Sequence, residues 1–190
     1  AEIPELTIDE TTVYLDGSIF IFENGRLDAD YDSSTSITRT AQGGVPPYTY
    51  STPGAHGTNA KVDPSTGYVW AIDNGQEIIK VTDSAGKSKS YTVMVSGVTQ
   101  VYYLGQETWS GANQSASDGK GRLPSVSELR EIYSVFGGSQ FPYSGKIWSS
   151  EKAGSLPPTY HTVNMQTGEN GSALQNTMLN SVFLYVEPLK

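Results

Sequence analysis

Short runs with the two-residue period of a β-strand recur along the first half of the chain. Four such runs are "VPPYTYS" (45–51), "YVWAI" (68–72), "EIIKVTD" (77–83) and "SYTVMVSG" (90–97). Turn sequences separate them; "DPSTG" (63–67) has proline at its second position and glycine at its end. Strands at this spacing predict a β-sandwich. We expect "LTI", "TVYL" and "SIFIF", within the first 35 residues, to supply its opening strands.

The second half mixes strands with two predicted helices. In "GKGRLPSVSELREIY" (119–133), Ser125 is placed as an N-cap and Glu128 stands three positions later, where a capping box needs its acid. The apolar stripe of this helix is Leu129, Ile132, Tyr133 and Phe136, and Gly137 and Gly138 end it. The segment "ETWSGANQSASDG" (107–119) places Trp109, Ala112 and Ala116 on one helical face.

Four strand-like runs complete this half: "QVYYLGQ" (100–106), "KIWSS" (146–150), "TYHTVNM" (159–165) and "SVFLYVEP" (181–188). A strand, two helices and further strands do not form a sandwich. We therefore predict a mostly β protein with a small α+β part, divided into domains at 1–97 and 98–190.

Composition narrows the chemistry. Among 190 residues there is no cysteine, which excludes disulfides, thiol catalysis and cysteine-ligated metals. No apolar run approaches the roughly 20 residues of a membrane-spanning helix. The chain does not open on a signal peptide, and we expect it to be a piece of a longer protein.

The charge is acidic and uneven. The net charge is −8; residues 1–97 carry 13 acidic and 6 basic side chains, whereas residues 98–190 carry 7 and 6. Nucleic-acid binding needs clustered lysine and arginine, so no nucleic-acid partner is expected. The acidic half is interpreted as a solvated surface.

Several motifs carry a family resemblance. The run "GQEIIKVTDSAGKSKSYTVMV" (75–95) resembles the last two strands of bacterial immunoglobulin-like domains. In the second half, Tyr102 and Tyr103, the helix with Trp109, "GRLPSVSEL" (121–129), "IWSS" (147–150) and "VFLYVEP" (182–188) resemble a C-type lectin-like domain. In this order, an immunoglobulin-like β-sandwich followed by a C-type lectin-like domain resembles the C-terminal tip of the intimin/invasin family of inverse autotransporter adhesins.

The resemblance implies a non-catalytic adhesin on the bacterial cell surface, with a barrel in the outer membrane and further immunoglobulin-like repeats upstream. It implies a monomer without a cofactor. The implied partner is a host cell-surface or serum protein: an integrin-like receptor, a bacterially delivered receptor or an immunoglobulin.

Calcium and catalytic sites are tested against the acidic residues and histidines. Sugar-binding lectin-like domains hold calcium through several oxygen ligands. From Gln140 to Pro188 the only acids are Glu151, Glu169 and Glu187, so we predict calcium-independent binding. The triplet Asp28, Asp30 and Asp32 lacks the glycine and glutamate of an EF-hand, and weak metal binding there is left open. His56 and His161 are too far apart in sequence to indicate a triad or a zinc site.

The predicted binding face consists of three late segments: 137–146, 151–160 and 166–176. Aromatic side chains beside mixed charge in loops are typical of interface hot spots. The candidate ligand-binding residues are Phe141, Tyr143, Lys146, Glu151, Lys152, Tyr160, Glu169 and Gln175. The alternative for Phe141 and Tyr143 is a place in the core.

Two rival functions remain open. A carbohydrate-binding module could stack sugar rings on Trp70, Trp109 or Trp148, although Trp109 falls on a buried helix face and Trp148 in a core-like strand. A purely structural stalk segment is the other, and the lectin-like half argues against it.

Overall fold

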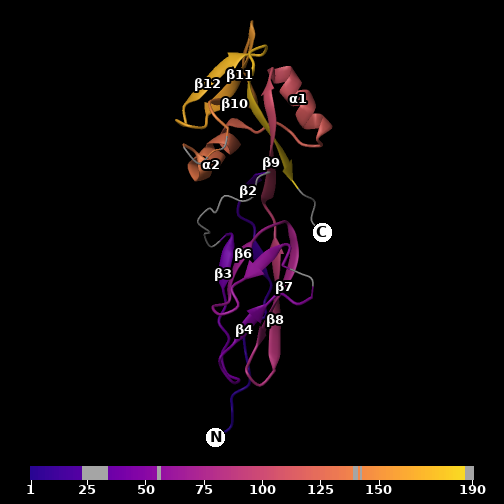
Figure 1. The fold of residues 1–190 in the computed structure, drawn as a ribbon, viewed down its shortest axis with the longest axis vertical. Coiled ribbons are helices and arrows are strands. Elements are labelled where there is room, and N and C mark those ends of the chain that lie inside the picture. Colours follow the sequence, from indigo (N-terminus) through magenta and orange to yellow (C-terminus); the bar gives the residue numbers. More distant parts are fainter. Residues whose placement is uncertain (23–33, 55–56, 139–140, 142, 187–190) are drawn as a thin grey trace. The chain divides into compact units, whose positions relative to one another are not determined.

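The computed structural model describes residues 1–22, 34–54, 57–138, 141 and 143–186. Of these, residues 1–19 and 34–98 form one compact unit, and residues 20–22 and 99–186 form a second (Figure 1). The Asp28, Asp30 and Asp32 triplet, His56 and Glu187 lie outside the described residues.

The first unit contains two sheets. One has the strand order β1-β8-β7-β4 and the other β3-β6-β5. The four-stranded sheet is built from β1 (Val13–Leu15), β8 (Ser88–Val95), β7 (Gly75–Thr82) and β4 (Thr49–Ser51). The three-stranded sheet is built from β3 (Ser36–Thr38), β6 (Tyr68–Ala71) and β5 (Ala60–Val62).

Alternation along the strands explains how these sheets close on a core. In β7, Ile79 and Val81 are buried, whereas Gln76 and Ile78 are exposed and Lys80 is half-buried. Val62 of the three-stranded sheet packs against Tyr50 and Val81 of the other sheet. The predicted β-sandwich is therefore confirmed.

The turn predicted at "DPSTG" joins β5 to β6. One carboxylate oxygen of Asp63 accepts hydrogen bonds from the Ser65 hydroxyl and from the backbone N–H groups of Ser65 and Thr66. These bonds, the Ser65 hydroxyl first, lower the pKa of Asp63 to about 2. Gly67 closes the turn with φ +75°, a conformation that favours glycine.

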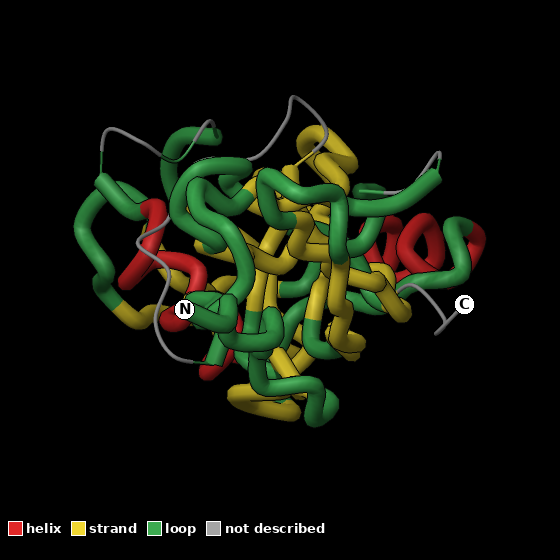
Figure 2. The backbone as a smooth tube through the Cα atoms, turned by 90° about the horizontal axis from the view of Figure 1, so that it is seen from below, coloured by secondary structure: helices red, strands yellow, loops and turns green. Residues whose placement is uncertain are grey.

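The second unit contains one six-stranded sheet of order β12-β11-β10-β13-β9-β2. Its strands are β2 (Ile19–Phe22), β9 (Val98–Glu107), β10 (Lys146–Ser155), β11 (Pro158–Asn164), β12 (Asn170–Leu174) and β13 (Leu179–Val186). Between β9 and β10 lie the helices α1 (Trp109–Asp118) and α2 (Val126–Phe136). They are the helical segments of Figure 2, and neither is long and apolar enough to cross a membrane.

The predicted capping box at α2 is confirmed. The Ser125 hydroxyl accepts from the Glu128 N–H at 3.1 Å, and the Glu128 carboxylate accepts from the Ser125 N–H at 3.0 Å. Leu129 and Ile132 are fully buried, as the stripe predicted, while the side chain of Phe136 lies outside the described residues.

The two helices cover opposite faces of the sheet. Leu129 and Ile132 of α2 pack in one core with Ile147 and Leu184. The α1 residues Ala112 and Ala116 pack in another core, which holds the neighbouring strand residues Trp148 and Phe183. Because successive strand residues point to opposite faces, these two cores lie on opposite sides of one sheet.

Three elements differ from the sequence expectations. Residues 20–22, expected in the opening sandwich, lie in the second unit, where Phe20 is buried in the α2-side core. The segment 151–160, expected as a loop, is the β10–β11 hairpin, and half of the segment 166–176 is β12. We keep 1–97 and 98–190 as the proposed domain limits, with β2 as a strand that the second unit takes from the first range.

Candidate functional site

A groove of about 550 Å³ lies in the second unit between the start of α2 and the β10–β11–β12 strands. Seven of its eight lining residues have polar or charged side chains. The lining residues are Val126, Ser127, Arg130, Glu151, Lys152, His161, Thr162 and Asn170. The groove is therefore built on a helix and a sheet, which hold their side chains more firmly than loops do.

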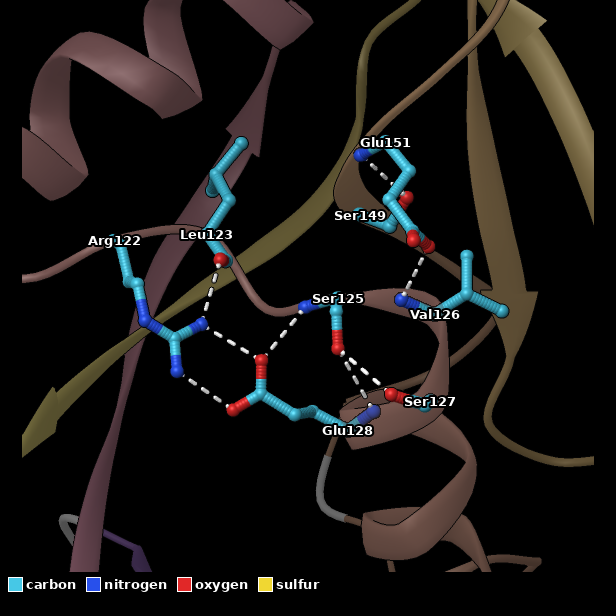
Figure 3. A network of polar contacts seen from close by, with 8 residues as sticks. All are labelled: Arg122, Leu123, Ser125, Val126, Ser127, Glu128, Ser149 and Glu151. Atoms are coloured by element: carbon cyan, nitrogen blue, oxygen red, sulfur yellow. Dashed lines mark hydrogen bonds and ion pairs between the residues drawn. The ribbon is translucent and has the colours of Figure 1, made fainter.

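The wall formed by α2 is fixed by a polar network (Figure 3). Both nitrogens at the end of Arg122 donate to the Glu128 carboxylate at 2.7 Å, in a bidentate pair. The Arg122 hydrogen bonds are the main cause that lowers the pKa of Glu128 and, in return, raises that of Arg122. The first turn of α2, which carries Val126 and Ser127, is thereby held in place.

Glu151 reaches the same helix start from β10. Its carboxylate Oε2 accepts a hydrogen bond from the Val126 N–H at 2.8 Å, and its own N–H donates to the Ser149 hydroxyl at 3.1 Å (Figure 3). A carboxylate at the N-terminal end of a helix is favoured by the helix dipole. This contact offsets part of the negative charge of Glu151 within the groove.

Arg130 forms the end of the groove near β12. Its Nη1 donates to the Gly168 carbonyl at 3.1 Å and to Asn170 Oδ1 at 2.8 Å, which ties α2 to the turn between β11 and β12. His161, an exposed residue of β11, lies in the same groove.

These charges decide what the groove can do chemically. Arg130 and Lys152 are cationic, and Glu151 is already engaged by the helix N–H. Within the part of the chain that the structure describes, no three acidic or histidine side chains gather closely enough to hold a metal ion. The arrangement fits reversible recognition of a polar segment that carries carboxylates.

The structure separates the eight predicted contact residues into groups. Glu151 and Lys152 line the groove. Phe141 is 5% exposed, inside the α2-side core, and Tyr143 stacks on Tyr103 with ring centroids 3.9 Å apart. Their alternative place, in or against the core, is the one observed.

The remaining four lie on other parts of the second unit. Tyr160 stacks on Trp109 at 3.6 Å between centroids, and the Gln175 carbonyl accepts from the Trp109 N–H. Lys146 at the start of β10 and Glu169 before β12 are exposed.

The three tryptophans of the carbohydrate alternative are less available than that function needs. Trp148 is fully buried, and its Nε1 donates to the Glu107 carbonyl at 2.9 Å. One face of Trp109 is covered by Tyr160. Trp70 is half-buried, stacks on Tyr68 and lines a shallow hollow of the first unit.

Sequence reasoning missed Arg130 and His161 as lining residues, whereas Asn170 lies in the predicted segment 166–176. Ser127 and Arg130 do carry a signal: they lie three residues apart on the polar side of the predicted helix. Local sequence does not place His161 and Asn170 in one groove, because their positions there depend on how β11 and β12 pair.

The chain is similar in sequence to a known protein. No protein-family profile matches the chain. The intimin of Hafnia alvei is 30% identical over 135 residues, which are 70% of this chain and 46% of that protein. The chain thus spans about half the length of the curated relative it matches.

Two solved structures share the fold. A C-terminal 282-residue fragment of intimin, in complex with the intimin-binding domain of the translocated intimin receptor, has a TM-score of 0.50 and 21% identity, covering 93% of this chain and 66% of that one. An intimin variant from EHEC O157:H7 has a TM-score of 0.51 and 18% identity, covering 97% of this chain and all of that one.

The fold is accordingly mostly β, an immunoglobulin-like sandwich and a C-type lectin-like part with two short helices, as the sequence predicted. The sequence match to the Hafnia intimin and the fold shared with the two intimin structures make the chain similar to members of the intimin/invasin family.

Proposed function

We propose that this chain is the receptor-binding part of a bacterial surface adhesin, and that it binds a host-derived receptor polypeptide through the groove between α2 and the β10–β11 hairpin. The observation that carries the proposal is the charged groove lined by Arg130, Glu151 and Lys152 on a rigid helix and sheet. A related intimin fragment is bound to a receptor domain, which supports a polypeptide partner.

The predicted contact residues differ in solvent exposure, and we therefore propose different roles for them. Lys146, Glu151, Lys152 and Glu169 are exposed and are proposed as direct contacts. Tyr143, Tyr160 and Gln175 are half-buried, and Tyr160 packs on Trp109 of α1, on the other face of the sheet from the α2 wall, so these three are proposed as secondary contacts outside the groove. Phe141 supports the ring of Tyr143 from the core, with the two rings edge to face at 5.6 Å.

The proposal is for binding without catalysis, without calcium and by a monomer. A translocated receptor, an integrin-like receptor and an immunoglobulin are the candidate partners. The carboxylates of the partner are expected to meet Arg130 and Lys152, so binding should weaken as salt screens these charges.

The test is a binding panel with the purified chain. The probes are the intimin-binding domain of the translocated intimin receptor, an integrin ectodomain, immunoglobulin G and a glycan array. We expect saturable binding to one polypeptide, weakened about tenfold or more by Lys152→Glu, which corresponds to about 1.4 kcal/mol.

Lys87→Glu is the matched control, because Lys87 is an exposed lysine in the β7–β8 turn of the first unit and the charge change is the same. Equal loss with both variants would show a general charge effect and contradict the groove. Binding to glycans alone would favour the carbohydrate module instead.

A further inference from the structure

The outer strand β12 is open on one side. It is the last strand of the six-stranded sheet and, among the described strands, pairs with β11 alone. Asn170, Ser172 and Leu174 are exposed along it. An edge strand presents unpaired backbone N–H and C=O groups that another extended chain can bind.

The printed hydrogen bonds define which residues face outward. The Asn164 N–H donates to the Glu169 carbonyl at 2.9 Å, and the Gln175 N–H donates to the Pro158 carbonyl at 3.1 Å, in one continuous register. In an antiparallel pair, every second residue bonds to the partner strand. Gly171 and Ala173 therefore face β11, and the backbone groups of Ser172 point to the open side.

The neighbouring backbone supports this assignment. The Leu174 carbonyl, on the same open side, is taken by the Thr177 N–H at 2.9 Å where the strand ends. The outward groups left along the strand include the N–H and C=O of Ser172 and the N–H of Leu174. They form a row that an extended backbone can satisfy, since such a backbone repeats donors and acceptors at the same spacing.

The edge lacks the usual protection. Natural edge strands carry lysine, proline, inward charge or a bulge that discourages pairing. The sequence "NGSAL" of β12 has no charged residue and no proline, and its register with β11 has no shift, whereas β10 is bulged against β11.

The open edge adjoins the groove. Asn170 belongs to β12, lines the groove and accepts from Arg130. Ser172 pairs with His161, another lining residue, so the two side chains share a sheet face. A strand added to β12 would carry alternate side chains on the face that holds the groove.

We infer that the receptor polypeptide binds by β-strand addition, laying an extended segment of about four or five residues along the open edge of β12 while its carboxylates meet Arg130 and Lys152. This inference rests on the proposed function. A second copy of the chain is disfavoured as the occupant, because each copy carries a net charge of −8.

The decisive variant is Ser172→Pro. Proline removes the outward N–H of Ser172 and leaves the pairing with β11 intact, which is where edge strands accept proline. We expect it to weaken binding of the probe selected in the panel, such as the intimin-binding domain of the translocated receptor, by about tenfold or more at an unchanged melting temperature.

Two controls flank this variant. Ser172→Ala keeps the N–H and measures the effect of the side chain alone, so Ser172→Pro should bind about tenfold or more weakly than Ser172→Ala. Ala173→Pro removes an inward N–H and should lower the melting temperature, which checks the assigned direction of the strand.

Amide hydrogen exchange gives a readout that does not depend on the variants folding. The N–H groups of Ser172 and Leu174 should exchange quickly in the free chain and slowly in the complex. Dimerisation of the free chain by ultracentrifugation, lost in Ser172→Pro, would identify a second copy as the occupant and overturn the inference.

The outcomes separate the two proposals. If Lys152→Glu loses binding while Ser172→Pro binds fully and exchange at Ser172 is unchanged, strand addition is wrong and the groove stands. If no polypeptide of the panel binds the parent chain, both proposals fail.

Discussion

Glu128 shows how much a single residue reveals in sequence and how much only in the fold. Its capping bond to Ser125 is predicted from a spacing of three residues. Its bidentate pair with Arg122 is not, because the two are six residues apart across the bend before α2. Local spacing defines the cap, whereas the ion pair needs the path of the chain.

The ion pair between Arg122 and Glu128 predicts that the stability contributed by Glu128 depends on pH. The pKa of Glu128 lies below its ordinary value of 4.5, chiefly through the Arg122 hydrogen bonds. The stabilisation is therefore present above pH 4.5 and is lost as the pH falls through the lower folded pKa. Glu128→Gln should cost about 0.5–1 kcal/mol at pH 7 and almost nothing well below the folded pKa.

Urea unfolding of both proteins from pH 7 to pH 2 measures this difference. The lowered pKa values of Asp63 and Asp83 are common to both proteins and cancel in the comparison. A cost for Glu128→Gln that stays constant over the whole range would contradict the assignment.

Helices are predicted better than late strands for a physical reason. Helix α2 carries its own cap, stripe and stop within one segment. Strands β10 and β12 contain Gly154 and Gly171, which weaken a local strand pattern. Their extended form depends on pairing with β11, so the groove that they line could not be read from local sequence.

Two glycines differ in the space that an added Cβ would find: Gly121 in the segment before α2, and Gly111 in α1. A Cβ on Gly121 would lie 2.5 Å from the Leu184 carbonyl oxygen and against the Phe183 ring. Backbone cannot move aside cheaply, so Gly121→Ala should cost about 1–3 kcal/mol. At Gly111 in α1, the nearest atom is the end of the Glu107 side chain, which can move.

Gly111→Ala is therefore the matched control and should stabilise by up to about 1 kcal/mol, because alanine favours helix. Thermal unfolding of both variants checks this contrast. Equal destabilisation would show that close approach is not the cause at Gly121.

At the scale of the whole molecule, the absence of a described metal site predicts how the protein responds to EDTA. The second unit, as far as it is described, gathers no metal-binding group of acids and histidines. We expect EDTA to leave the melting temperature and receptor binding of residues 98–190 unchanged. A lower melting temperature of this fragment in EDTA would reveal a calcium site, and a drop seen in the full chain alone would point to Asp28, Asp30 and Asp32.

The division of the chain leads to the last prediction. Expressed separately, residues 1–97 should show no helical circular dichroism and residues 98–190 all of it, because the two helices of the described residues lie between Trp109 and Phe136. The second fragment, however, lacks β2, whose Phe20 is 6% exposed in the core with Val101 and Leu184. Truncating a buried phenylalanine costs about 3–5 kcal/mol.

Residues 98–190 should therefore melt at a lower temperature alone than within the full chain. Phe20→Ala in the full chain should destabilise the second unit similarly. Equal melting temperatures for the fragment and the intact unit would mean that β2 is dispensable and that the limit at residue 97 describes the domain fully.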